Sequence, residues 1–276
     1  MDPNTSSALS AVVVLICEAL AHIDDEVQYI WRRESCWSKW AYLYLRFSPI
    51  LLLGAALTAT TSGDSDVTYN MVTCQVFYGF MVFGMNMSVW VVDSLLIARV
   101  SALYYLSRKV SYILRVMLAA ELITMVIACG LSIPKATFVP GCLTASMPRV
   151  CLASLLSSVL SQIILFVLTI VHFLRSRNGE LPKGSIETIL TRDGTWAFGV
   201  TSLVNVCNVL VFHFSGFGLD GFGNIVSFWT LVAFSALGCR IQLNLYQKTA
   251  ITCPEEDSYS LGVLSSINFT HTLQDV

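Results

Sequence analysis

Long apolar stretches separated by short polar linkers recur along the whole chain. Seven of them are long enough for a membrane helix, which needs roughly 20 mostly apolar residues. These stretches cover residues 8–30, 40–59, 74–98, 113–133, 150–174, 195–214 and 224–245. The pattern predicts an all-α bundle of seven transmembrane helices over residues 1–246, followed by a polar tail over 247–276 that is disordered and cytoplasmic.

The first stretch also has features of a secretory signal peptide. Its end, Ala19-Leu20-Ala21, resembles a cleavage site. Against cleavage, residues 1–10 contain no Lys or Arg, and Glu18 interrupts the apolar run. We therefore expect an uncleaved first membrane helix.

The distribution of basic residues predicts the orientation of the bundle. All but three of the 16 Lys and Arg residues fall in or near the first, third and fifth linkers or the last span and tail. The exceptions are Lys135 and Arg149 in the fourth linker and Arg46 inside the second stretch. Because basic loops stay in the cytoplasm, the N-terminus should lie outside and the C-terminus inside. The sequence does not distinguish the plasma membrane from an endomembrane.

Composition excludes several classes of protein. The chain is 55% hydrophobic and only 12% charged, with a mean hydropathy of +0.69. A soluble domain is usually about a quarter charged, so a soluble enzyme is excluded and the lipid bilayer is the expected partner. The 16 Lys and Arg against 18 Asp and Glu leave no basic excess for nucleic acid.

Ionisable residues inside the apolar stretches should face the bundle interior, because a charge in lipid is costly. In the first stretch they share one helical face and comprise Glu18, His22, Asp25, Glu26 and Tyr29. Arg46 lies at a similar depth in the second stretch, so we predict an ion pair between Arg46 and Asp25 or Glu26. This ion pair and the charged groups near the inner ends of other stretches form a predicted charged layer. Its members are Asp25, Glu26, Arg46, Asp93, Arg99 and Arg240.

This layer has two interpretations. It could be a lock that breaks and re-forms as helices shift, or a static set of contacts that fixes helix packing. The deeper polar groups also have two interpretations, since they could line a ligand cavity or form interhelical hydrogen bonds. Interhelical hydrogen bonds are the commoner case. They are Glu18, Glu121, Gln162, Asn205 and Asn208.

The predicted outer face carries two further candidate sites. Cys74 and Cys142 lie in a compartment that permits disulfides, and a bridge between them would fix the fourth linker over the bundle, with Cys151 as the rival partner. Asn4 begins an Asn-Thr-Ser glycosylation sequon in the predicted outer tail, very near the membrane.

Catalytic motifs are absent from the sequence. No Lys lies in any stretch, and the metalloprotease, P-loop and nucleophile-elbow patterns are missing. The four His residues are spread too widely for one metal site. We predict no catalytic, cofactor-binding or metal-binding residues.

Residues 15–52 resemble a fungal, chiefly basidiomycete, domain of unknown function, number 6533. The features that carry the resemblance are Glu18, Glu26-Val27, Trp31, Arg32-Arg33, Lys39 and Arg46-Phe47. The sequence departs from that family at Cys17-Glu18, where Tyr-Asp is usual, and at Ala21-His22, where Leu-Thr is usual. The resemblance implies an integral seven-helix membrane protein with no established activity.

A weaker, fold-level resemblance is to receptors coupled to G proteins. Like them, the chain has a Cys at the outer end of the third span and an Arg, Arg99, 25 residues later. Ala98 replaces the acidic residue expected before that Arg, and the last span lacks an Asn-Pro-x-x-Tyr motif. A shared fold does not imply a shared function.

Three functions remain open from the sequence. The leading hypothesis is a receptor-like sensor, with the charged layer as its switch, an unknown ligand and a cytoplasmic signalling partner. The alternative is a small-solute or proton-coupled transporter with Glu18, Asp93 and Glu121 along its path. The third is an accessory membrane protein without a ligand.

Overall fold

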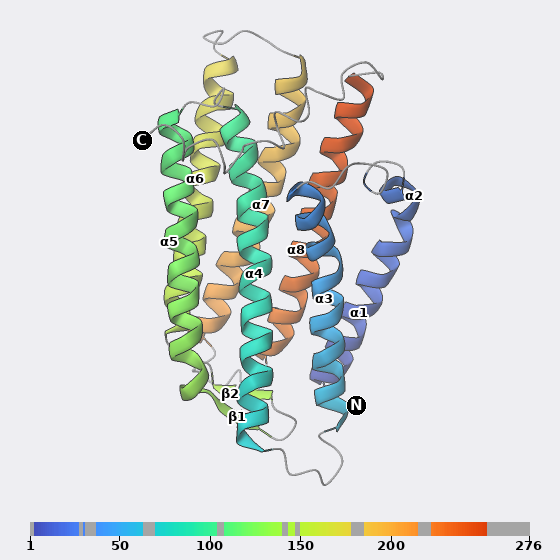
Figure 1. Cartoon of the computed structure of the whole chain (residues 1–276), viewed down its shortest axis with the longest axis vertical. Coiled ribbons are helices and arrows are strands. Elements are labelled where there is room, and N and C mark those ends of the chain that lie inside the picture. The colour runs from blue at the N-terminus through green and yellow to red at the C-terminus, as the bar shows by residue number, and fades with distance from the viewer. Residues whose placement is uncertain are drawn as a thin grey trace, which may run out of the picture.

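The computed structural model is a bundle of long, roughly parallel helices that run side by side along one axis (Figure 1). It describes residues 3–27, 30, 37–62, 70–103, 108–139, 143–146, 150–177, 185–214 and 222–252. The helices are α1 Pro3–Ala21, α2 Ile23–Glu26, α3 Trp37–Ser62, α4 Met71–Leu103, α5 Arg108–Ser132, α6 Cys151–Arg177, α7 Ser185–Phe214 and α8 Phe222–Thr252.

Among the described residues, six helices are long and apolar enough to cross a membrane, which makes the chain a multi-pass membrane protein. The qualifying segments are Pro3–Ala21, Trp37–Ala59, Met71–Ser101, Arg108–Lys135, Cys151–His172 and Gly223–Asn244. The remaining predicted span, residues 195–214, lies in α7, whose described apolar part, Gly199–His213, is shorter than these. The count of seven spans therefore stays a prediction.

The first predicted span is not one continuous helix, and this part of the prediction is wrong. Helix α1 begins at Pro3 and ends at Ala21, and His22, with φ −115° and ψ 9°, precedes the short helix α2. Continuing α1 straight on would hold the acidic run from Asp24 to Glu26 in the apolar layer. The break leaves Asp24 exposed while Glu26 is buried. Among the residues of the predicted acidic face, the side chains of Asp25 and Tyr29 lie outside the described residues, so that face stays a prediction.

A short antiparallel hairpin is missing from the all-α prediction. Strand β1 (Thr137–Val139) pairs with β2 (Leu143–Ser146) after the 3-10 turn η2 (Ile133–Lys135), in which Pro134 stops the continuation of α5. The ring of Phe138 packs edge-on against Tyr78 of α4, with 5.9 Å between ring centroids. The hairpin and the start of α1 lie at one end of the bundle, and α8 ends at the other (Figure 1).

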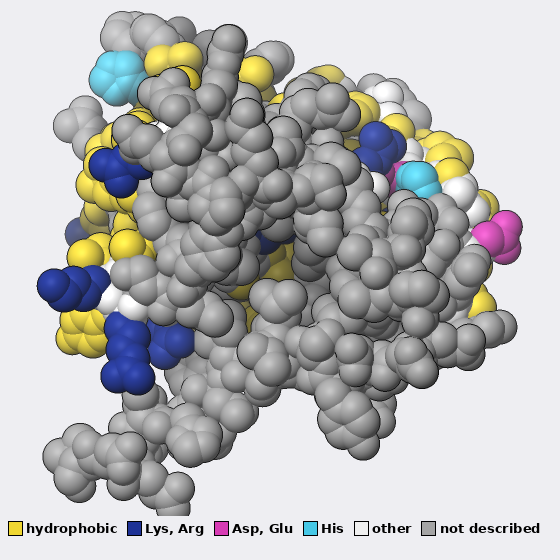
Figure 2. Space-filling view, turned by 90° about the horizontal axis from the view of Figure 1, so that it is seen from above, with side chains coloured by type: hydrophobic (Ala, Val, Ile, Leu, Met, Phe, Trp, Pro, Cys, Tyr) yellow, Lys and Arg dark blue, Asp and Glu magenta, His cyan; other side chains and the backbone are white. Residues whose placement is uncertain are grey.

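The end of the bundle opposite the hairpin carries exposed basic side chains. Figure 2 looks onto this end and shows Lys and Arg side chains grouped along one side of the described surface. Arg108, Lys109 and Arg115 of α5 and Arg175 of α6 are exposed. This distribution is the one expected for a cytoplasmic face, although the orientation itself stays a prediction.

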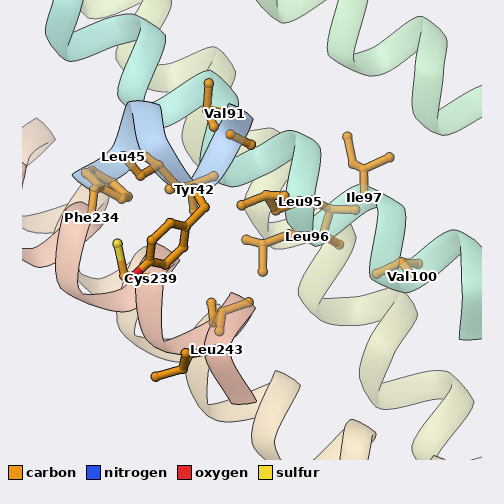
Figure 3. Packing of buried hydrophobic residues seen from close by; sticks show 14 of the residues in the cluster. Tyr42, Leu45, Val91, Leu95, Leu96, Ile97, Val100, Phe234, Cys239 and Leu243 are labelled. Atoms are coloured by element: carbon orange, nitrogen blue, oxygen red, sulfur yellow. The ribbon is translucent and has the colours of Figure 1, made fainter. Parts of the chain in front are cut away.

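The core is built where α3, α4 and α8 meet. Tyr42 and Leu45 of α3, Leu96 of α4 and Phe234 of α8 are almost completely buried against one another (Figure 3). On the outer surface, large apolar side chains such as Leu51 remain exposed, as expected for a surface in contact with lipid.

Gly238 of α8 lies at a close approach of α8 to α3. A Cβ atom at Gly238 would lie 2.6 Å from Cδ1 of Leu45 and 3.5 Å from Cγ2 of Val92 on α4. Small residues at such positions let membrane helices pack closely. A hydrogen bond of 2.8 Å from the Ser235 hydroxyl to the Leu45 carbonyl fixes the same pair of helices.

Candidate functional site

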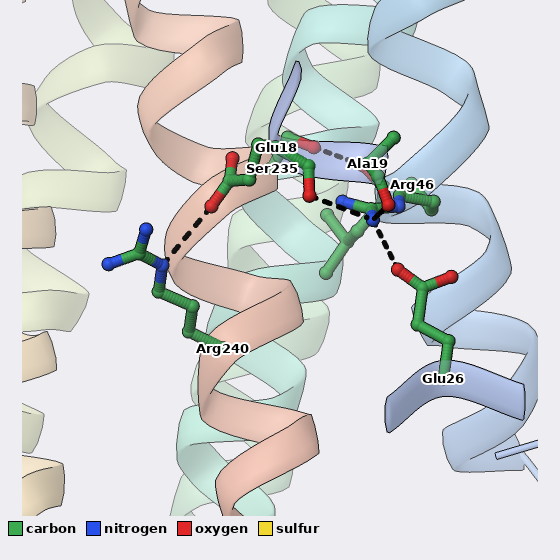
Figure 4. Close-up of polar contacts among 7 residues, drawn as sticks. Glu18, Ala19, Glu26, Arg46, Ser235 and Arg240 are labelled. Carbon is green, nitrogen blue, oxygen red and sulfur yellow. Dashed lines mark hydrogen bonds and ion pairs between the residues drawn. The ribbon is translucent and has the colours of Figure 1, made fainter. Parts of the chain in front are cut away.

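Arg46 of α3 is buried and holds the ends of two other helices. Its guanidinium pairs with the carboxylate of Glu26 on α2 and donates to the carbonyl of Ala19 at 3.0 Å and of Glu18 at 3.4 Å (Figure 4). The last carbonyls of a helix have no partner within it and carry a partial negative charge. Arg46 therefore satisfies the C-terminal end of α1 and, through Glu26, fixes α2.

Glu18 belongs to a second ion pair that extends to α8. Its carboxylate accepts a hydrogen bond from Nε of Arg240 at 3.1 Å. The Glu18 side chain is 11% exposed and that of Arg240 is 64% exposed. We call Glu18, Glu26, Arg46 and Arg240 the ion-pair network; it connects α1, α2, α3 and α8 at one place (Figure 4).

The predicted charged layer is divided by the structure. Glu26 and Arg46 meet as predicted, while the side chain of Asp25 lies outside the described residues. Arg99 of α4 donates to the backbone carbonyl of Ile241 on α8. Asp93 faces α6 instead of joining the layer, because two polar side chains of that helix bind its carboxyl group.

Asp93 is the centre of a separate buried set of polar groups. Its carboxyl oxygens accept hydrogen bonds from Nε2 of Gln162 at 3.1 Å and from the Ser158 hydroxyl at 3.4 Å. The carboxyl group of Glu121 on α5 and the Ser161 hydroxyl of α6 are buried near this group. We call these five residues the acid cluster; α4, α5 and α6 contribute to it.

The remaining predicted polar groups lie between α7 and α8. Asn208 donates to the Thr230 hydroxyl at 2.9 Å and to the Val204 carbonyl at 2.9 Å, so it makes an interhelical hydrogen bond. Asn205 is buried, and its Nδ2 has no hydrogen-bond partner in the described part of the chain. Asn4 lies in the first turn of α1 with its Oδ1 buried, and its glycosylation stays a prediction.

Cys74, at the start of α4, is disulfide-bonded, whereas Cys151 is a free thiol. Cys142 lies outside the described residues, so its pairing with Cys74 stays a prediction. We expect maleimide labelling of the denatured protein to detect an additional pair of thiols after reduction. Cys74→Ser and Cys142→Ser should each remove this difference between reduced and unreduced samples, and Cys151→Ser should keep it. A difference that survives in Cys142→Ser would show that Cys74 has another partner.

Comparison with known proteins identifies one part of the chain. Residues 6–51 match the model of a family of unknown function, DUF6533. No curated protein matches the chain. The matched DUF6533 segment includes α1, α2 and the first part of α3. Three members of the ion-pair network, Glu18, Glu26 and Arg46, lie in it, and Arg240 comes from outside.

Sequence reasoning missed the hydroxyl groups of the acid cluster and the hydroxyl of Ser235. Ser158 and Ser161 were not singled out, although with Gln162 they have the helical spacing of one polar face in an apolar helix. Ser235 had no comparable signal, because it binds a backbone carbonyl on a distant helix. Within the described ranges, no group of three or more His, Cys, Asp and Glu side chains could hold a metal.

Proposed function

We propose that the protein is a receptor-like membrane sensor whose ion-pair network reports movement of α8 to α1 and α3. The observation that carries this proposal is the double role of Glu18. Its backbone carbonyl accepts a hydrogen bond from Arg46, and its carboxylate accepts one from Arg240. A displacement of α8 that pulls on Arg240 therefore acts on the same residue that Arg46 holds.

The two ion pairs of the network differ in how easily they break. The Arg240–Glu18 pair is partly exposed, and such pairs contribute only about 0–1 kcal/mol. The Arg46–Glu26 pair is buried, and removing one partner from such a pair costs about 3–5 kcal/mol. In a switch, α8 would separate from α1 while α1, α2 and α3 stay together as one unit.

The position of the network suits an output toward the cytoplasm. It lies where α1 ends, toward the bundle end that carries exposed basic residues (Figures 1 and 2). A signalling partner that binds this end would sense whether α8 is attached to α1. The ligand of the sensor would act on α8 from the opposite end of the bundle or from within it.

Hydrogen–deuterium exchange of the full chain in nanodiscs tests this proposal. Arg240→Gln should increase amide exchange in the last turn of α1 and in α8 around Arg240, because it removes the Arg240–Glu18 ion pair. Arg115→Gln, which removes an exposed arginine of α5, is the matched control and should leave these peptides unchanged. Equal exchange in the wild type and Arg240→Gln would contradict the proposal.

Flux measurements separate a sensor from the alternative transporter. Liposomes that contain the reconstituted protein and a pH-sensitive dye receive an imposed pH gradient. A sensor should dissipate the gradient no faster than empty liposomes do. Faster dissipation that depends on Asp93 or Glu121 would favour a proton-coupled transporter.

A further inference from the structure

The acid cluster is the most deeply buried group of ionisable side chains outside the ion-pair network. Asp93 and Gln162 are 0% exposed and Glu121 is 5% exposed. The cluster lies inside helices long and apolar enough to cross a membrane. Ionisable groups at such depth are costly, and those that are present usually mark functional sites.

The charges of the cluster are not balanced by a basic side chain. The carboxyl groups of Asp93 and Glu121 lie near each other and are both buried. In the part of the chain that the structure describes, the ion pairs involve other residues, and the donors to Asp93 are neutral amide and hydroxyl groups. Two carboxyl groups this close cannot both be ionised without a positive charge between or beside them.

The atoms that lack a partner show what kind of charge would fit. Oε2 of Glu121 and Oε1 of Gln162 are buried and have no hydrogen-bond partner among the described residues. The amide oxygen is only an acceptor, and so is each oxygen of an ionised carboxylate. The Gln162 amide is held against Asp93 through its Nε2, so its Oε1 lies next to the carboxyl pair. Acceptor oxygens around a net negative charge are the surroundings that a cation requires.

We infer that the acid cluster binds a small monovalent cation, for which sodium is the natural probe. The available ligands are carboxyl, amide and hydroxyl oxygens, which are the donor atoms of hard cations. Calcium takes 6–8 oxygen ligands and magnesium usually keeps several waters, whereas this site offers five side chains in a fully buried position. A monovalent cation with one proton shared by the carboxyls would leave the cluster neutral. The site is separate from the ion-pair network and does not depend on the proposed sensor function.

Thermal unfolding of the purified full chain in detergent tests the inference. The unfolding temperature is compared in sodium chloride, potassium chloride and choline chloride at equal ionic strength and constant pH. Sodium well above its Kd should raise the unfolding temperature by about 2–4 °C over choline, in a saturable manner. Asp93→Asn and Glu121→Gln, which keep the shape but remove the charge, should lose this dependence.

Two further variants keep the test informative if the charge variants do not fold. Gln162→Met removes the unpartnered oxygen and should weaken sodium binding by about tenfold or more. Thr169→Val changes another buried polar residue of α6, whose hydroxyl binds only the Leu165 carbonyl at 2.8 Å, and should keep the full sodium effect. The inference is overturned if the wild type unfolds at the same temperature in sodium and choline, as neutralisation by protons alone predicts. Stabilisation by calcium or magnesium without any by sodium would also overturn it.

Discussion

Replacing Arg46 with methionine should lower the free energy of unfolding by about 3–5 kcal/mol, because it leaves the Glu26 carboxylate buried without its counter-charge. The carbonyls of Glu18 and Ala19 also lose their donor. Methionine keeps most of the side-chain volume, so the loss reflects charge and hydrogen bonding. Unfolding in mixed micelles of dodecyl maltoside and sodium dodecyl sulfate, followed by circular dichroism, measures the difference.

Two variants show whether burial is the cause. Arg240→Met removes the exposed arginine of the same network and should cost no more than about 1 kcal/mol. The double variant Glu26→Gln/Arg46→Met removes both charges of the buried pair and should recover much of the stability lost in Arg46→Met. Equal losses for Arg46→Met and Arg240→Met would show that burial does not determine the strength of these pairs.

Replacing Gly238 with alanine should be destabilising, although alanine normally favours helices. The new Cβ would lie 2.6 Å from Cδ1 of Leu45, which is itself fully buried. Because Leu45 is fully buried, either its side chain leaves its packed position or the helices shift, and overpacking of this kind costs about 1–3 kcal/mol. The same mixed-micelle measurement detects the loss.

The control for this variant is a glycine with free space around it. Gly130 of α5 is exposed, and a Cβ atom added there would have no neighbouring side chain within 4 Å. Gly130→Ala should be neutral or stabilising by up to about 1 kcal/mol, because alanine has the higher helix propensity. Combining Gly238→Ala with Leu45→Ala should cost less than the sum of the two single changes, since the second makes room for the first. Strict additivity would contradict a steric origin.

Hydropathy predicted most of the membrane helices because lipid forces every backbone polar group to bond within its own segment. Six predicted spans correspond to helices that could cross a membrane. The break at His22 could not be predicted this way. It depends on which acidic side chain finds a buried partner, and Arg46, the partner of Glu26, is 20 residues further along the chain. The hairpin after Pro134 was missed because its strands are only three and four residues long.

Partners across the bundle were harder to predict than the elements. Depth predicted that Arg46 pairs with Asp25 or Glu26, and the structure shows the pair with Glu26. Depth placed Asp93 with the same layer, but the direction in which its side chain points determines its partners. That direction is toward Ser158 and Gln162 of α6. Arg240 binds Glu18, which is 222 residues away, and no local pattern indicates such a contact.

The capping of α1 by Arg46 has a consequence for the biogenesis of the protein. Helix α1 contains no Lys or Arg, and the nearest basic residues after it are Arg32 and Arg33. The donor that satisfies its last carbonyls belongs to α3, which leaves the ribosome later. We therefore expect the C-terminal end of α1 to be held in place only once α3 has been synthesised. A nascent chain that stops before Arg46 should hold its N-terminal helix less firmly than the full chain does.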